Sequence, residues 1–335
     1  MSLLYSSAIP TERIAAIEAA LVKAFNTADV TSISLLAGGL SGSAVYKIVT
    51  GGQPYVLKLI TPNNAIAIPD SLTLAATAGI APALRYEDKQ QGIVISDFIE
   101  NKPVRGIFAP DKLAVELGGA IRTLHEIPYN GEGKDLFETV DGMIEQFRKT
   151  NMLSGPLFDE CFQHYETIRS RYPRTASDKV FSHNDLNPSN ILCDGEKIWI
   201  IDWDVASLND RYVDLANAAN FFVQTKEQES ALLHAYFNGA VDDHKMARFY
   251  VMRQVCRIIY SLLMFQLALQ QKPAGYEHDQ QMEGNDLRAF GSLMALGKLS
   301  LAAYEGQFMY GKALFNEAVQ QMRTSRFADA IAQFE

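Results

Sequence analysis

Apolar residues in the first hundred positions follow a helical period and then the alternation of short strands. Residues 12–25 carry apolar side chains on one helical face. After them come five short runs rich in β-branched and aromatic residues, the first three separated by glycine clusters. The runs are residues 31–36, 44–49, 54–60, 84–86 and 93–96, with a further helix expected over 64–78. The pattern predicts a leading helix and an antiparallel sheet.

Beyond Pro103 the pattern changes to long amphipathic helices, and from Asp214 onward nearly everything has helical periodicity. The helices expected between these points are residues 110–126, 135–151 and 156–171. One strand pair interrupts them, over residues 190–193 and 197–201, with a turn at Asp194-Gly195. The predicted fold is therefore α+β with two lobes, a sheet lobe over residues 1–100 and a larger helical lobe over residues 101–335.

Composition narrows the class of protein. With 48% hydrophobic and 21% charged residues, the chain has the make-up of an ordinary globular protein. Its formal net charge of −9 argues against nucleic acid as the main partner, because neutralising phosphates requires clustered Lys and Arg. The most apolar stretch, residues 258–265, is too short to span a bilayer.

The compartment is predicted from the cysteines and from the first residues. Cys161, Cys193 and Cys256 stand far apart and form no CxxC pair, which predicts free thiols in a reducing environment. The first ten residues lack the charged and apolar segments of a signal peptide. We therefore expect a cytoplasmic protein, and the sequence leaves the oligomeric state open.

Residues 181–204, FSHNDLNPSNILCDGEKIWIIDWD, carry the clearest chemical pattern. Asp185 is followed by Asn190 and, after an apolar strand, by Asp202. Phosphoryl transfer needs a carboxylate that orients and deprotonates the acceptor hydroxyl, and oxygen ligands that hold Mg²⁺ against the phosphates. A loop, a strand, a tight turn and a returning strand would bring Asn190 and Asp202 side by side. We predict Asp185 as the catalytic base, and Asn190 and Asp202 as metal ligands.

The segments HNDLNPSNIL and IIDWDVASLNDRYVDLA resemble the aminoglycoside phosphotransferase and choline/ethanolamine kinase superfamily, which shares the two-lobed protein-kinase-like fold. The run Asp202-Trp203-Asp204 is most similar to the choline-kinase-like branch. In protein kinases Phe-Gly follows this aspartate and an Ala-Pro-Glu segment comes later, and the chain has neither. The resemblance implies ATP and Mg²⁺ as cofactors and a hydroxyl of a small molecule, rather than of a polypeptide, as the acceptor.

The resemblance also assigns roles near the N-terminus. Lys58 matches the family's phosphate-binding lysine, and backbone groups of Asp97, Phe98 and Ile99 would bind the adenine. The glycine-rich loop between two strands would close over the phosphates through its backbone NH groups. The expected loop contacts are Gly38, Gly39, Ser41, Gly42 and Ser43. In the family the lysine pairs with a helix glutamate, whereas the helix expected here offers only Asp70.

Four further residues are expected near the reaction. His183 either braces the catalytic loop through hydrogen bonds or exchanges protons. Asp204 assists metal or substrate binding or forms a salt bridge, and Tyr212 is expected to contact the substrate. Asp214 begins a helix, where a carboxylate is favoured, and the resemblance implies that it steadies the catalytic loop.

The identity of the acceptor stays open. Aromatic faces and acidic groups would suit a cationic amino alcohol such as choline or ethanolamine, while an aminoglycoside or thiamine are alternatives. The aromatic candidates, at a helical spacing that is equally typical of a packed core, are Tyr212, Phe221, Phe222, Tyr250, Tyr260 and Phe265. A nucleotide-binding module without catalysis is the alternative of another class. The missing helix glutamate favours it, and the intact set of Asp185, Asn190 and Asp202 argues against it.

Overall fold

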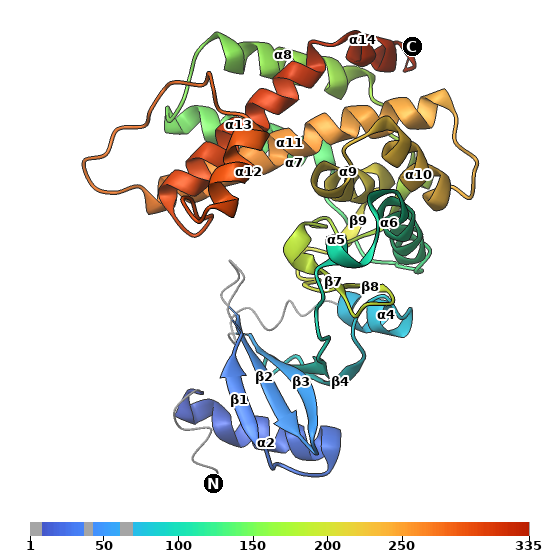
Figure 1. The fold of residues 1–335 in the computed structure, drawn as a ribbon, viewed down its shortest axis with the longest axis vertical. Coiled ribbons are helices and arrows are strands. Elements are labelled where there is room, and N and C mark those ends of the chain that lie inside the picture. Colours follow the sequence, from blue (N-terminus) through green and yellow to red (C-terminus); the bar gives the residue numbers. More distant parts are fainter. Residues whose placement is uncertain (1–8, 37–42, 61–69, 335) are drawn as a thin grey trace. The chain divides into compact units, whose positions relative to one another are not determined.

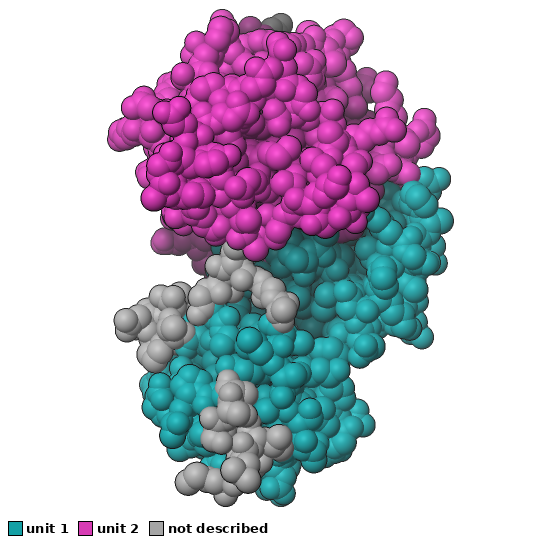
Figure 2. Space-filling model, turned by 60° about the vertical axis from the view of Figure 1, so that its left-hand side comes forward, with its two compact units in different colours: residues 1–128, 185–206 teal, residues 129–184, 207–335 magenta. Residues whose placement is uncertain are grey.

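The computed structural model describes residues 9–36, 43–60 and 70–334. Two compact units, coloured separately in Figure 2, consist of residues 1–128 with 185–206 and of residues 129–184 with 207–335. The α+β class is confirmed, because the first unit contains a five-stranded sheet and the second is almost entirely helical. The division differs from the expected boundary at residue 100, since the predicted strand pair belongs to the same unit as the sheet.

The sheet of the first unit has the strand order β1-β2-β3-β5-β4, and all neighbouring strands are antiparallel (Figure 1). Its strands are β1 (Ser32–Leu35), β2 (Ala44–Thr50), β3 (Gln53–Leu59), β4 (Leu84–Asp88) and β5 (Ile93–Asp97). The turn between β2 and β3 passes through Gly51 and Gly52, whose φ angles of 58° and 77° lie in the left-handed region that glycine adopts readily. The alternation in the sequence thus predicted the sheet.

One face of the sheet is covered by helix α2 (Thr11–Phe25). Leu57 of β3 is fully buried and packs in one cluster with Ile17 and Leu21 of α2. Successive side chains of a strand point to opposite faces, so Lys58 lies on the face away from this cluster. The sheet therefore presents Lys58 on the side that the α2 core does not occupy.

A hairpin and three helices complete the first unit. They are α4 (Ser71–Thr77), α5 (Val104–Ile107), α6 (Pro110–His125) and the paired strands β7 (Ile191–Cys193) and β8 (Ile198–Ile200). The hairpin confirms the predicted strand pair, and backbone hydrogen bonds from Lys102 to Cys193 and from Ile200 to Ile80, each 2.8 Å, attach it to the unit. Helix α4 is shorter than the predicted helix, of which residues 64–69 lie outside the described residues.

The second unit is built from helices packed around α11. They are α7 (Leu136–Thr150), α8 (Pro156–Arg171), α9 (Arg211–Phe222), α10 (Lys226–Tyr236), α11 (Asp243–Gln271), α12 (Leu287–Ala295), α13 (Tyr304–Met322) and α14 (Ser325–Ala332). A two-stranded ladder that the sequence did not predict joins β6 (Lys179–Ser182) to β9 (Ser207–Asp210). Each of these strands has four residues, too few to show a clear alternation.

Helix α11 is the only helix in the described ranges that is long and apolar enough to cross a membrane. Within the unit, 67% of its most apolar window is buried, and the helix packs against α9, α13 and α14. A helix in the core of a folded unit meets the same criteria of length and hydropathy. Most of its apolar residues are buried in this packing, while Leu263 and Leu269 are exposed.

Gly311 lies where α13 packs against α11. A Cβ atom at this position would come within 2.7 Å of the Phe265 ring and 3.2 Å of the Ser261 carbonyl oxygen. The Phe265 ring is buried and stacks on Phe147 at a centroid distance of 5.4 Å, so it has little room to move. We predict that Gly311→Ala lowers the free energy of unfolding by about 1–3 kcal/mol, because overpacking outweighs the better helix propensity of alanine.

Gly291→Ala in α12 is the matched control, because an added Cβ there meets nothing within 4 Å. This substitution is expected to raise the free energy of unfolding by up to about 1 kcal/mol, the helix-propensity gain alone. Urea unfolding of both variants measures the difference. Equal stabilities for the two variants would show that the contact between α11 and α13 at Gly311 is not tight.

Candidate active site

The β7–β8 hairpin brings Asn190 next to Asp202. Ile191 pairs with Ile200, and the ladder continues with a 3.0 Å hydrogen bond from the Ile201 NH to the Asn190 carbonyl oxygen. Asn190 ends a short 3₁₀ turn (Pro188–Asn190), and Asp202 follows the returning strand with a left-handed φ of 65°. The two residues predicted as metal ligands therefore lie at the same open end of the hairpin.

Asp185 is held in the same place by amide groups. The Asn190 side-chain NH₂ donates to the Asp185 backbone carbonyl at 2.9 Å and to its carboxylate at 3.0 Å. Asn187, which the sequence analysis did not single out, donates to the same carboxylate oxygen at 3.0 Å. The side-chain NH₂ of Asn190 is thus engaged by Asp185.

Lys58 reaches the same cluster from the sheet. Its ammonium group contacts both carboxylate oxygens of Asp204, at 2.8 and 2.9 Å, and one oxygen of Asp202 at 3.3 Å. Asp70 pairs instead with Lys89 at 2.5 Å. The carboxylates that compensate Lys58 thus follow strand β8, and the acidic residue next to helix α4 is engaged elsewhere.

The donor set at the end of the hairpin fits Mg²⁺. This ion prefers carboxylate, carbonyl and water oxygens and is usually held by one or two carboxylates together with substrate phosphates. Asp202 supplies a carboxylate and Asn190 an amide oxygen, with the ammonium of Lys58 3.3 Å from Asp202. Among the described residues there is no group of three or more His, Cys, Asp or Glu that could hold a metal, as a zinc site would require.

Asp214 binds the backbone of the loop that leads to Asp185. Its fully buried carboxylate accepts hydrogen bonds from the NH groups of His183, at 2.7 Å, and Asn184, at 2.8 Å. Asn184 has a φ of 68°, and its carbonyl accepts a 3.1 Å bond from the Asn217 side chain. His183 is also fully buried. These contacts explain how α9 supports the loop within the second unit.

Part of the predicted nucleotide site lies outside the described residues. Gly38, Gly39, Ser41 and Gly42 belong to that part, whereas Ser43 is described and half-buried. The NH of Asp97 donates to the Ala83 carbonyl at 2.9 Å, so it is not free for a purine. Within the described ranges, the NH groups of Phe98 and Ile99 make no backbone hydrogen bond. These two residues keep the donors that an adenine would need.

A cavity of about 530 Å³ is lined in part by this segment, through Asp97, Phe98 and Ile99. Tyr55, Asp97 and Trp199 are among the residues that line it. Tyr55 points to the sheet face opposite Lys58, and Arg85 binds both oxygens of the Asp97 carboxylate, at 2.6 and 2.8 Å. We therefore do not assign this cavity to the nucleotide.

Tyr212 lies inside the second unit rather than at a surface. It is 2% exposed, and the Arg248 guanidinium lies 4.6 Å from the centre of its ring. Burial raises the pKa of its hydroxyl above the ordinary value. Phe222, Tyr250 and Phe265 are also buried, whereas Phe221 and Tyr260 form a half-buried edge-to-face pair. Tyr212 therefore has almost no exposed surface with which to contact an acceptor, whereas Phe265 borders a cavity of about 250 Å³ within the second unit.

Solved structures share this fold. A choline/ethanolamine kinase family protein from Mesorhizobium loti matches with a TM-score of 0.67 at 20% identity, over 95% of this chain and 97% of that one. The choline kinase LicA from Streptococcus pneumoniae matches with a TM-score of 0.61 at 18% identity, over 93% and 99%. Macrolide and spectinomycin phosphotransferases share the fold as well. Together these matches confirm the predicted kinase-like fold.

Sequence comparison gives the family. Protein LicA of Haemophilus influenzae is 36% identical over 178 residues, which are 51% of this chain and 51% of that protein. The alignment thus spans about half the length of this curated relative. The model of the phosphotransferase enzyme family matches residues 32–250, a range that contains Lys58, Asp185, Asn190 and Asp202. Since this match covers more than half of the chain, the protein belongs to the phosphotransferase enzyme family.

Proposed function

We propose that the protein transfers the γ-phosphoryl group of ATP, bound with Mg²⁺, to a hydroxyl group of a small molecule. The observation that carries the proposal is one continuous cluster within the first unit. Asp185 contacts Asn190, the Asn190 backbone bonds the residue before Asp202, and Lys58 contacts Asp202. A base, two oxygen ligands and a cation are the groups that phosphoryl transfer needs.

Each side chain has one role in this proposal. Asp185 accepts the proton of the acceptor hydroxyl while the hydroxyl oxygen bonds to the γ-phosphorus and the bond to the β-phosphate oxygen breaks, which releases ADP. Asn190 and Asp202 would hold Mg²⁺, which would supply positive charge to the phosphates during the transfer. Lys58 binds phosphate oxygens once it exchanges its contacts with Asp202 and Asp204 for them.

Asp204 takes the place of the missing helix glutamate in this account. Lys58 is only 18% exposed at its side chain, so its ammonium needs a nearby carboxylate when nucleotide is absent. Asp204 provides two contacts and Asp202 one. The departure from the family pattern therefore does not favour a module without catalysis, because the lysine keeps an acidic partner.

We infer that the acceptor is a cationic amino alcohol of the choline and ethanolamine type. The kinship with LicA and the fold shared with choline kinases support this class. The second candidate is an aminoglycoside, another antibiotic or thiamine as the acceptor. The fold shared with antibiotic phosphotransferases favours the antibiotics within this group.

An acceptor panel tests the proposed function. Purified protein with ATP and Mg²⁺ is incubated with choline, ethanolamine, thiamine, aminoglycosides, spectinomycin and macrolides, and ³¹P NMR follows ADP and the phosphorylated product. We expect a phosphomonoester of choline or ethanolamine to form in step with ADP. An antibiotic ester would select the second candidate. Absence of product with every acceptor, combined with tight Mg-dependent ATP binding, would support the binding module instead.

Asp185→Asn should lower kcat by at least about 100-fold, because the general base is removed while the size of the side chain is retained. Binding of MgATP should stay within about threefold of the unchanged protein, since Asn190 keeps its backbone contact to residue 185. Steady-state kinetics and calorimetric titration measure the two effects. Asp88→Asn, at an aspartate in β4 outside the cluster, is the control, and a kcat loss in that variant equal to the loss in Asp185→Asn would refute the assignment.

Asp202→Asn and Asp204→Asn separate metal binding from lysine pairing. Asp202→Asn should raise the Mg²⁺ concentration for half-maximal nucleotide binding by about tenfold or more, because one charged ligand is lost. Asp204→Asn should leave that concentration within about twofold and lower kcat, because Lys58 loses its main partner. Titrating Mg²⁺ at constant nucleotide gives both values. The same shift in both variants would contradict the separate roles.

A further inference from the structure

Helix α9 carries Asp214 near its beginning and is held at its end by an arginine of α11. The Arg253 guanidinium donates to the carbonyl oxygens of Ala219 and Val223, at 3.4 and 3.5 Å, and to the Asn220 side chain at 3.0 Å. The Asn220 side chain returns a 3.0 Å bond to the Arg253 carbonyl. A cation at the last carbonyls of a helix is favoured by the helix dipole. Arg253 therefore caps α9.

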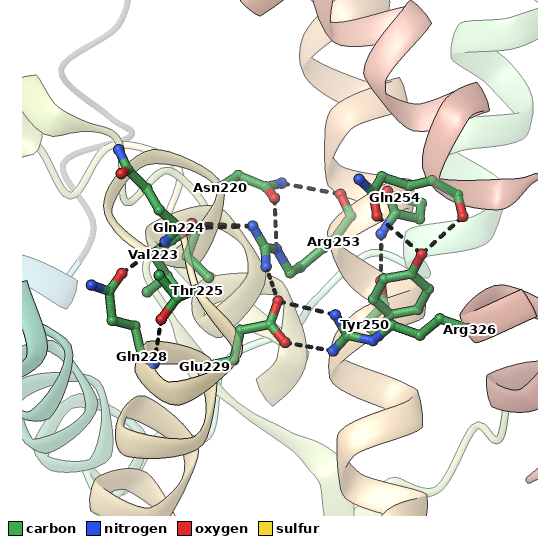
Figure 3. Close-up of polar contacts among 12 residues, drawn as sticks. Asn220, Val223, Gln224, Thr225, Gln228, Glu229, Tyr250, Arg253, Gln254 and Arg326 are labelled. Carbon is green, nitrogen blue, oxygen red and sulfur yellow. Dashed lines mark hydrogen bonds and ion pairs between the residues drawn. The ribbon is translucent and has the colours of Figure 1, made fainter. Parts of the chain in front are cut away.

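Arg253 is buried, with 8% of its surface exposed, and its charge is balanced from α10. Glu229, which is 4% exposed, accepts from the Arg253 Nη1 group, as Figure 3 shows. The same carboxylate accepts from Arg326 of α14, at 2.5 Å for Nη2 and 3.4 Å for Nη1. Arg326 also lies over the Tyr250 ring, 4.1 Å from its centre. The buried carboxylate of Glu229 thus accepts hydrogen bonds from two guanidinium groups.

The position of Glu229 depends on both partners. Carboxylate and guanidinium groups prefer a bidentate pair, in which two nitrogens donate to the two carboxylate oxygens. To form such a bidentate pair, Arg253 would have to use Nε or Nη2, which now donate to Asn220, Ala219 and Val223. The other carboxylate oxygen of Glu229 instead accepts from Arg326.

The first turn of α9 is held in a similar way. Asp210 caps the helix by accepting from the Tyr212 NH at 2.9 Å, and it binds Arg248 of α11 at 2.9 Å. Arg248 also pairs with Asp178 at 2.5 Å. Two buried arginines of α11 thus hold the two ends of the helix that carries Asp214, and the Arg253 end is linked through Glu229 to Arg326 of α14.

We propose that Arg326 is a positioning residue for the catalytic loop: through Glu229 and Arg253 it holds α9, and thereby the Asp214 carboxylate that binds the NH groups directly before Asp185. The expected effect on catalysis rests on the proposed function, whereas the link from Arg326 to Asp214 does not. The simpler alternative is that Arg326 only attaches α14 to the rest of the unit.

Arg323 provides a matched control for this alternative. It lies three residues earlier and forms a two-pronged pair with Glu160 of α8, with both contacts at 2.6 Å. Both pairs join an arginine near the C-terminus to a glutamate, but among the described residues Glu160 forms no hydrogen bond or ion pair with α9, α10 or α11, and its other partner is His164. Arg323→Gln therefore removes an attachment of the same kind without touching Arg253.

The test measures amide hydrogen exchange at His183 and Asn184 in Arg326→Gln, Arg323→Gln and the unchanged protein, at a temperature where all are folded by circular dichroism. We expect about tenfold faster exchange at both amides in Arg326→Gln and less than about twofold change in Arg323→Gln. In Arg326→Lys the two amides should exchange more slowly than in Arg326→Gln, because lysine restores the positive charge but cannot form a bidentate pair with Glu229. Glu229→Gln replaces Arg326→Gln if the latter fails to fold.

Kinetics with the acceptor found in the panel give the second measurement. Arg326→Gln should lower kcat at least about fivefold with KM for MgATP within about twofold, the result of a misplaced base, while Arg323→Gln keeps the original kcat. Unchanged exchange at His183 and Asn184 in Arg326→Gln, or equal effects in both variants, would overturn the positioning role. Faster exchange in a protein that phosphorylates no acceptor would leave the link standing and refute the proposed function alone.

Discussion

A hydrogen bond between the Ile201 NH and the Asn190 carbonyl, at the open end of the β7–β8 hairpin, determines how close the proposed metal ligands lie to each other. The hairpin turn that supports it is itself well ordered by hydrogen bonds. Asp194 accepts from two backbone NH groups and from the Trp199 indole. Burial raises the pKa of Asp194, but these bonds outweigh it and bring the pKa to about 2. The turn therefore keeps its charged acceptor at any physiological pH.

Each unit has its own set of polar contacts. In the first, Lys58 of the sheet contacts the carboxylates that follow the hairpin, which gives the cluster that we propose for phosphoryl transfer. In the second, the buried carboxylate of Asp214 binds backbone NH groups just before that cluster in the sequence. A buried charge of this kind is stable only when hydrogen-bonded, so the loop and the carboxylate depend on each other. Around them, arginines of α11 hold the helix that carries Asp214.

Local patterns in the sequence predicted the sheet, the hairpin and the grouping of Asp185, Asn190 and Asp202, because each follows from periodicity or from short spacing. The partner of Lys58 was not predicted, since Asp204 lies 146 residues further along the chain and nothing local marks the pair. The contact between Glu229 and Arg326 spans 97 residues and was missed for the same reason. Tyr212 was placed at the substrate because helical spacing of aromatics does not distinguish a core from a pocket.

The most direct test of the account is the position of a metal ion. A crystal of the protein with Mn²⁺ and a non-hydrolysable ATP analogue would be measured at the manganese absorption edge. The account predicts an anomalous peak at about 2.0–2.3 Å from the Asn190 amide oxygen and an Asp202 carboxylate oxygen, bridging to the phosphates. A metal bound elsewhere, or nucleotide bound with neither residue at the metal, would contradict it.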